Sequence, residues 1–353
     1  MKCNYLTPAV FIALFSAILF GASTPLAKLF INDVNPILLA GLLYLGSGIG
    51  LLLIRIIKDL KWQKTNLLKK DWLWFIGSII FGGILAPIFL MLGLENTQAS
   101  MASLLLNFES VLTALLAWIV FKEHTDKKII LGMGLIVIGG VLLSFPSSLS
   151  LTRFFGSLMI ICACLFWAID NNLTRNISNG DALFIAGFKG LIAGIVNVLI
   201  ALFFIKAQLP LSFQIGYIML IGFFGFGVSL VLFVLALRGL GTARTGAYFS
   251  TAPFIGALIA IIILGESSSF LFWIAAGLMA VGVWLHLSET HQHEHTHEPL
   301  YHSHKHVHDK HHKHDHDFLW DENSDKAHTH PHQHERLKHS HPHYPDIHHR
   351  HRH

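Results

Sequence analysis

The feature that most limits the fold of this chain is a series of ten apolar runs within its first 287 residues. Each run has roughly 17–25 residues and few charges, the length that a helix needs to cross a bilayer core. Inside a membrane the backbone polar groups must bond to one another, and a helix achieves this within one segment. The runs cover residues 8–30, 36–57, 72–94, 99–121, 129–145, 154–173, 182–205, 213–237, 245–264 and 270–287. The sequence therefore predicts an all-α polytopic membrane protein with ten transmembrane helices.

Composition excludes several other classes of protein. Hydrophobic residues make up 53% of the chain and charged residues 13%, so no block outside the last 66 residues is polar enough for a soluble domain. The formal net charge of +4 comes mainly from loops and tail, where Lys and Arg orient helices rather than bind nucleic acid. The sequence has no GxxxxGK[ST] loop and no convincing nucleophile–base constellation. We expect neither an enzyme nor a required cofactor.

An internal repeat divides the apolar part into two halves. Three pairs of segments match in outline at offsets of 143 to 146 residues, which indicates duplication rather than chance. They are Leu92–Glu123 with Leu235–Glu266, Ala17–Leu29 with Ala163–Arg175, and Ala40–Gly48 with Ala186–Gly194. Each half, residues 8–145 and 154–287, holds five predicted helices. Because five is odd, the second half enters the membrane upside down, an arrangement typical of alternating-access transporters.

Loop charges predict the orientation of the helices. Basic residues cluster in the loops after the second and fourth runs and flank the loop after the eighth, and such loops face the cytoplasm. They include Arg55, Lys58, Lys61, Lys64, Lys69, Lys70, Lys122, Lys127, Lys128, Arg238 and Arg244. We therefore expect both termini on the cytoplasmic side of a bacterial-type inner (plasma) membrane.

The two halves resemble a known family. The segments that carry the resemblance are Ala102–Glu123 (ASLLLNFESVLTALLAWIVFKE), Gly134–Leu143 (GLIVIGGVLL), Gly246–Glu266 (GAYFSTAPFIGALIAIIILGE) and Ala275–Leu285 (AAGLMAVGVWL). They are similar to paired EamA domains of the drug/metabolite transporter superfamily. The resemblance implies ten helices around a central cavity and export of small metabolites or drugs, without indicating the substrate.

The first half departs from the family pattern in the fourth helix. The family commonly has proline in mid-helix; the second half keeps Pro253, whereas the first half has Ser110 preceded by Glu109. An ionisable group inside a span is costly and usually faces a cavity or a partner. We interpret Glu109 as a group that binds a proton or a cationic part of the substrate, or alternatively as a neutral structural carboxyl. Asn107, Ser103 and Thr113 are the polar candidates on the same helix.

A second candidate constellation joins the sixth and seventh helices. Asp170 and Asn171 lie near the cytoplasmic end of the sixth helix, and Lys189 lies about two turns into the seventh. They fit a compensated ion pair or a cytoplasmic substrate gate, and Trp167 is a candidate cavity residue. Pro87 and Pro253 are candidate kinks.

The last segment, residues 288–353, is rich in histidine and too polar to pack a core, so we expect a disordered cytoplasmic tail. Its HxH spacing suits Zn²⁺, Ni²⁺ or Co²⁺. The candidate ligands are His291, His293, His295, His297, His302, His304, His306, His308, His311, His312, His314, His316, His328, His330, His332 and His334.

Two functions follow from these patterns. The first is a secondary active exporter of a metabolite, amino acid or drug-like solute, proton-coupled, with a metal-binding tail. The second is a divalent transition-metal exporter whose tail senses or delivers the metal. The expected partners are the bilayer, a small solute and transition-metal ions, with no nucleic acid; the patterns leave the oligomeric state open.

Overall fold

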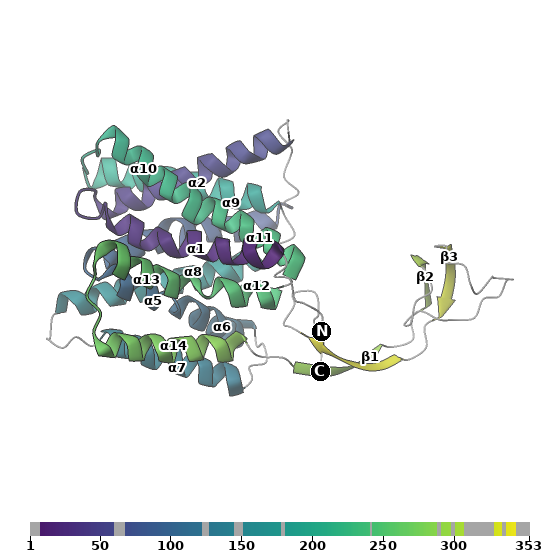
Figure 1. Cartoon of the computed structure of the whole chain (residues 1–353). Helices are drawn as coiled ribbons and strands as arrows, with labels where there is room; N and C mark the ends of the chain where they lie inside the picture. Colours follow the sequence, from purple (N-terminus) through teal and green to yellow (C-terminus); the bar gives the residue numbers. More distant parts are fainter. Residues whose placement is uncertain are drawn as a thin grey trace. The chain divides into compact units, whose positions relative to one another are not determined.

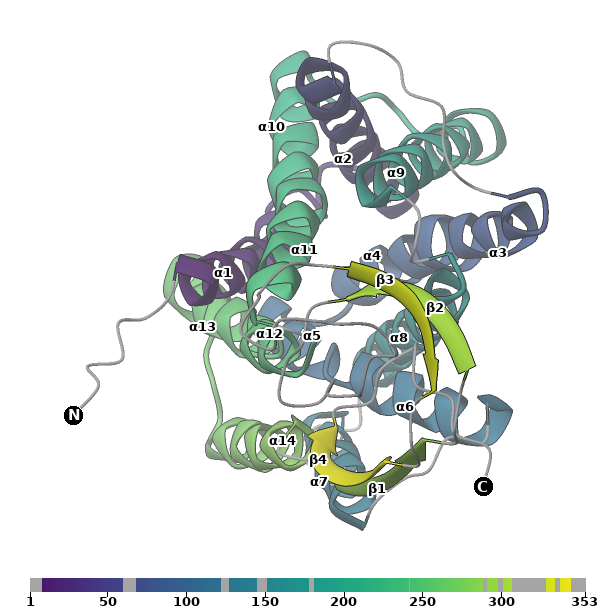
Figure 2. The ribbon, with the colours of Figure 1, turned by 90° about the vertical axis from the view of Figure 1, so that its right-hand side faces the viewer.

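The chain divides into two compact units, Met1–Glu289 and Thr290–His353, in the computed structural model. The structure describes residues 8–59, 68–121, 127–144, 151–177, 181–240, 242–287, 291–297, 301–306, 328–333 and 337–343. Within the first unit these residues form a bundle of helices (Figures 1 and 2). The multi-pass helical class predicted from the sequence is confirmed.

The first half of this unit runs from α1 to α7 and the second half from α8 to α14 (Figure 1). Three π-helical segments, labelled η, interrupt the α-helices. The first half comprises α1 (Pro8–Lys28), α2 (Pro36–Asp59), α3 (Asp71–Ser78), η1 (Ile79–Leu85), α4 (Ala86–Glu95), α5 (Ala99–Leu105), α6 (Phe108–Phe121) and α7 (Lys127–Ser144). The second half comprises α8 (Leu151–Arg175), α9 (Ala182–Leu199), η2 (Ile200–Phe204), α10 (Ser212–Gly222), η3 (Phe223–Val228), α11 (Ser229–Leu240), α12 (Thr242–Phe249), α13 (Ala252–Leu264) and α14 (Phe270–Leu287).

Nine helical segments of the described chain are long and apolar enough to cross a membrane. The tenth predicted run forms α14, whose apolar stretch Phe270–Leu285 is shorter. Large apolar side chains face outward, among them Leu73, Phe204 and Ile262, which are 76%, 83% and 77% exposed. Such a surface suits lipid rather than water.

The predicted fourth span is found as Ala99–Val120, but its helix is interrupted: α5 and α6 are separated at Leu106 and Asn107. The side-chain amide of Asn107 donates to the Leu104 carbonyl (2.9 Å), and the Ser110 hydroxyl donates to the Asn107 carbonyl (2.8 Å). Side chains that bond a carbonyl three residues back compete with the helical ladder and bend it. The break therefore needs no proline.

The ninth predicted helix breaks in the same way between α12 and α13. The Ser250 hydroxyl donates to the Ala247 carbonyl (2.8 Å) and the Thr251 hydroxyl to the Tyr248 carbonyl (2.6 Å). Pro253 follows at the start of α13, where its missing amide hydrogen costs nothing. Ser250 lies 143 residues after Asn107, so the two breaks match in the sequence repeat.

The packing of the helices pairs each half with the other. α2 packs on α9, α7 on α14 and α5 on α13, while α1 lies against α11 and α13, and α8 against α4 and α6. Figure 2 shows the pair α7 and α14 at one end of the bundle, with α2 and α9 at the opposite end. Close contact between α2 and α9 requires glycine: a Cβ at Gly190 would lie 2.9 Å from the Gly48 amide nitrogen.

The described residues of the tail form strands, which differs from the expectation of disorder. β1 (His291–His297) pairs antiparallel with β4 (Leu337–His343), and β2 (Tyr301–His306) with β3 (His328–Gln333). The His-x-His pattern has the two-residue period of a strand, so it is compatible with an extended ladder. Among the predicted ligands, His308, His311, His312, His314, His316 and His334 lie outside the described residues.

Candidate substrate and proton site

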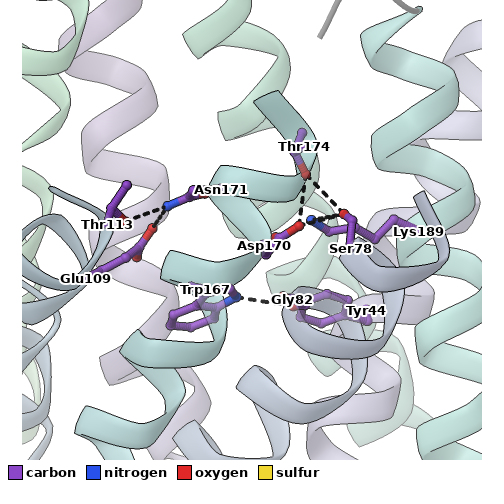
Figure 3. Close-up of polar contacts among 10 residues, drawn as sticks. All are labelled: Tyr44, Ser78, Gly82, Glu109, Thr113, Trp167, Asp170, Asn171, Thr174 and Lys189. Atoms are coloured by element: carbon purple, nitrogen blue, oxygen red, sulfur yellow. Dashed lines mark hydrogen bonds and ion pairs between the residues drawn. The ribbon is translucent and has the colours of Figure 1, made fainter. Parts of the chain in front are cut away.

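Three groups of polar contacts lie around α8, and together we call them the polar network (Figure 3). α8 supplies four of its side chains: Trp167, Asp170, Asn171 and Thr174. Neighbours in this set are one, three or four residues apart, so they lie on two adjoining faces of the helix. The pair Asp170–Thr174 points towards α3 and α9, and Asn171 points towards α6 (Figure 3).

Asp170 and Lys189 form a buried ion pair between α8 and α9. Their side chains are 6% and 19% exposed, and the Lys189 ammonium donates to the Asp170 carboxylate. The same carboxylate accepts from the Ser78 hydroxyl (2.5 Å) and the Thr174 hydroxyl (2.9 Å). The hydroxyls satisfy lone pairs that an isolated buried carboxylate would leave open.

The backbone next to this pair belongs to the π-helix η1. A π-helical residue bonds five residues back, and proline at 87 has no amide hydrogen to give to the Gly82 carbonyl. That carbonyl instead accepts from the Tyr44 hydroxyl (3.0 Å) and the Trp167 indole N–H (3.2 Å). Pro87 thus frees an acceptor that ties α2 and α8 to η1. A Cβ at Gly82 would also overlap the Asp170 carboxylate.

Glu109 lies in the first turn of α6, directly after the helix break. Its carboxylate accepts from the side-chain amide of Asn171 (2.8 Å), which also donates to the Thr113 hydroxyl (3.3 Å). Glu109 is partly exposed, and Asn171 and Ser110 are exposed. The carboxylate sits near the middle of the span Ala99–Val120, so an accessible acid lies at membrane depth.

A separate set of contacts lies at the C-terminal end of α1. The Lys28 ammonium donates to the carbonyls of Leu94 and Thr97 (3.0 Å for Thr97), near the C-terminus of α4. The Glu266 carboxylate accepts from the backbone amides of Ala99 (2.7 Å) and Ser100 (2.8 Å), at the start of α5. A cation at a helix C-terminus and an anion at a helix N-terminus are both the favourable choice. We call these contacts the Lys28–Glu266 latch.

Residues 7–145 and 154–288 both match the model of the EamA-like transporter family. The chain belongs to the EamA-like transporter family. It is 30% identical over 286 residues to an uncharacterized transporter of Methanothermobacter thermautotrophicus, covering 76% of this chain and 83% of the relative. It is 25% identical to the uncharacterized transporter YyaM of Bacillus subtilis, covering 69% and 82%. A crystal structure with a TM-score of 0.58 and 18% identity covers 78% of this chain and 94% of its own, which shows the shared fold.

Two predicted polar residues of this EamA-like transporter lie outside the network. Asn107 is buried and bonds within its own helix break. Ser103 is buried with no hydrogen-bond partner among the described residues, and it packs against Gly256 of α13. Pro87 and Pro253 lie beside irregular backbone, as described above. No group of three or more His, Cys, Asp or Glu side chains placed for a metal ion occurs within the described part of the chain.

Sequence reasoning missed four members of the network: Tyr44, Ser78, Gly82 and Thr174. Thr174 could have been found, because it lies one helical turn after Asp170 and such pairs share a face. Ser78 and Tyr44 carry no comparable signal, since a single hydroxyl in an apolar span is common. Gly82 contributes its carbonyl and the space that its missing side chain leaves for Asp170, and no side-chain pattern reveals either.

Proposed function

We propose that this member of the family is a secondary active transporter that exports a small solute by alternating access, coupled to protons at Glu109. The observation that carries the proposal is the partly exposed Glu109 carboxylate at mid-span, whose side-chain hydrogen-bond donor among the described residues is the neutral amide of Asn171. An acid in that setting can lose and regain its proton as the site changes sides. Asp170, by contrast, has its own cation.

Alternating access by two inverted five-helix repeats, residues 8–145 and 154–287 with ten spans, is supported by the packing. Under such a repeat α1 corresponds to α8, α2 to α9 and α7 to α14. The contacts of α8 with α4 and α6 then mirror those of α1 with α11 and α13, while α2 with α9 and α7 with α14 are self-symmetric pairs. A two-fold relation of this kind gives two equivalent arrangements, one open to each side.

Irregular backbone recurs at matching places, which also supports the repeat. η1 begins at Ile79 and η3 begins 144 residues later at Phe223, in the third helix of each half. The helix breaks before α6 and α13 match as well. Discontinuous helices near the bilayer midplane are typical of transporter binding sites. η2 has no counterpart in α2.

The latch and the loop charges suggest the state of the transporter. If basic loops face the cytoplasm, both termini are cytoplasmic and Lys28 and Glu266 lie at the outer face. The latch then seals the outer end, and Glu109 is reached from the cytoplasm. We place the protein in a bacterial-type inner membrane on the same basis.

We assign the histidine tail a separate role in binding Zn²⁺, Ni²⁺ or Co²⁺. Imidazole nitrogen suits these ions, and β1 with β4 brings His291 opposite His343 and His293 opposite His341. The metal-exporter alternative lacks a supporting cluster within the described spans. Metal transported through the spans is therefore the weaker hypothesis.

The test is transport by full-length protein in liposomes across a panel of amines, amino acids and divalent metals, with and without a pH gradient. We expect Glu109→Gln to insert normally and to lose proton-driven transport at least a hundredfold, because the proton site is gone. Asp33→Asn, an exposed loop carboxylate, is the matched control. Transport by Glu109→Gln that still follows the pH gradient would refute the proposal. A chain ending at Leu287 should lose metal binding and keep solute transport. Transport of a divalent metal that is lost with the tail would favour the metal exporter.

A further inference from the structure

The hydrogen-bond donors around Glu109 are almost all engaged by the protein. The Asn171 amide gives its two protons to Glu109 and Thr113, and the Ser110 hydroxyl donates to the Asn107 carbonyl. The charged donor of the network, Lys189, is held by Asp170 and Ser78. The Thr113 hydroxyl has no acceptor among the described residues, and the positive charge of Lys189 is compensated by Asp170.

The free groups are acceptors. The second carboxylate oxygen of Glu109 and the amide oxygen of Asn171 have no hydrogen-bond partner among the described residues, and both side chains are accessible. When Glu109 is ionised, it and Asp170 carry two negative charges against the one positive charge of Lys189, which pairs with Asp170. In that form the site offers one uncompensated negative charge and adjoining acceptor oxygens.

We propose that the transported solute is a protonated primary or secondary amine, whose ammonium N–H groups donate to Glu109 and Asn171. This inference rests on the proposed function and names its substrate class. An ammonium supplies the missing charge and the missing donors together, and hydrogen bonds between charged groups are the strong ones.

Three other ligand classes fit less well. An anion, or the carboxylate of an amino acid, finds Lys189 as the charged donor of the described network, and Asp170 already compensates that charge. A hard divalent metal ion finds one uncompensated carboxylate here, that of Glu109, with neutral oxygens from Asn171 and Thr113, so one of its two charges stays uncompensated. A quaternary ammonium has the charge but no N–H, so it leaves the acceptor oxygens unpaired after they lose water.

The amine and the proton compete for the same carboxylate, so exchange moves one amine for each proton. A protonated Glu109 binding an ammonium ion releases one proton to solution, and the carboxylate then pairs with the ammonium. Departure of the amine allows one proton to return. One amine therefore leaves for each proton that enters, and no other ion is required.

The experiment measures proton release when small probes are added to the full-length protein in detergent. The probes are n-butylamine, tetramethylammonium, butyrate and Mg²⁺. We expect n-butylamine to release about one proton per protein and tetramethylammonium to bind at least about tenfold more weakly. Butyrate and Mg²⁺ should release none. Equal binding of tetramethylammonium, or competition by butyrate or Mg²⁺, would overturn the amine assignment.

Variants separate the substrate class from the proton role. Glu109→Gln should lose the release and Asp33→Asn should keep it. Asn171→Leu, which retains the Glu109 charge, should weaken n-butylamine about tenfold through the lost acceptor. The infrared carboxyl band of Glu109 reports protonation without any solute. If the band titrates in the wild type but no amine displaces the proton, the amine is not the substrate class, and the proposed proton coupling at Glu109 still stands. A wild-type titration identical to that of Glu109→Gln refutes proton coupling itself.

Discussion

The ion pair between Asp170 and Lys189 allows a quantitative test of whether the pair stabilises the bundle or handles substrate. Asp170→Asn keeps the shape of the side chain and its contacts with Ser78 and Thr174 but leaves Lys189 as an unpaired, largely buried cation. Lys189→Met leaves the Asp170 carboxylate as the unpaired buried charge. Removing one partner of a buried pair costs about 3–5 kcal/mol, because the remaining charge has lost its compensation.

The double variant carries the information. When both charges are absent, no buried charge is left unpaired, and such replacements are often close to neutral. We expect each single variant to lose about 3 kcal/mol and the double variant no more than either single, which corresponds to a coupling of about 3 kcal/mol or more. The assay is denaturant unfolding of the four proteins in the same detergent. A double variant that loses the sum of the two singles would refute the pairing. If the pair is structural, the double variant also transports at a rate close to wild type; a silent double variant would instead assign the pair to the substrate gate.

Two further predictions follow from close contacts. Gly82→Ala should lower the free energy of unfolding by about 1–3 kcal/mol, because its Cβ overlaps Asp170, whereas Gly277→Ala, with open space around it, should be neutral or stabilising in the same unfolding assay. Lys28→Met should open the outer end of the bundle, because it removes charge-assisted hydrogen bonds worth about 1.5–3 kcal/mol each. Thr97 is 5% exposed, so a cysteine placed there should react several-fold faster with an impermeant maleimide once Lys28 is replaced. An unchanged reaction rate would argue against the latch.

The helical bundle was predictable because the bilayer admits so few structures. Runs of apolar residues near one membrane thickness can only be helices, so the positions of α1, α2 and α7 follow from hydropathy within a few residues. The family followed from duplicated motifs and was confirmed. Glu109 and Asp170 stood out because charge within an apolar run is expensive.

The local backbone was not predictable in the same way. Hydropathy averages over many residues, whereas the break at Asn107 depends on one amide that bonds one carbonyl, and η1 differs from an α-helix only in bonding the fifth residue back instead of the fourth. The partners of Lys28 were equally hidden, since they are carbonyls from a helix 66 residues away. Contacts to backbone atoms leave no trace in side-chain patterns.

The two helix breaks point to where the chemistry of this transporter differs between its halves. Both breaks place a fresh helix N-terminus inside the bundle, and an acid in the first turn of a helix is stabilised there. In the second half the corresponding positions are Ala252 and Pro253, which carry no charge, and Pro253 has no amide hydrogen. In the first half Glu109 occupies the position, and Asn107 and Ser110 make the break without proline. Glu109 therefore stands where the second half has Ala252, and Ser110 stands where it has Pro253. Under the proposed function, this asymmetry between two otherwise matching breaks places the proton-exchanging carboxylate in the first half alone.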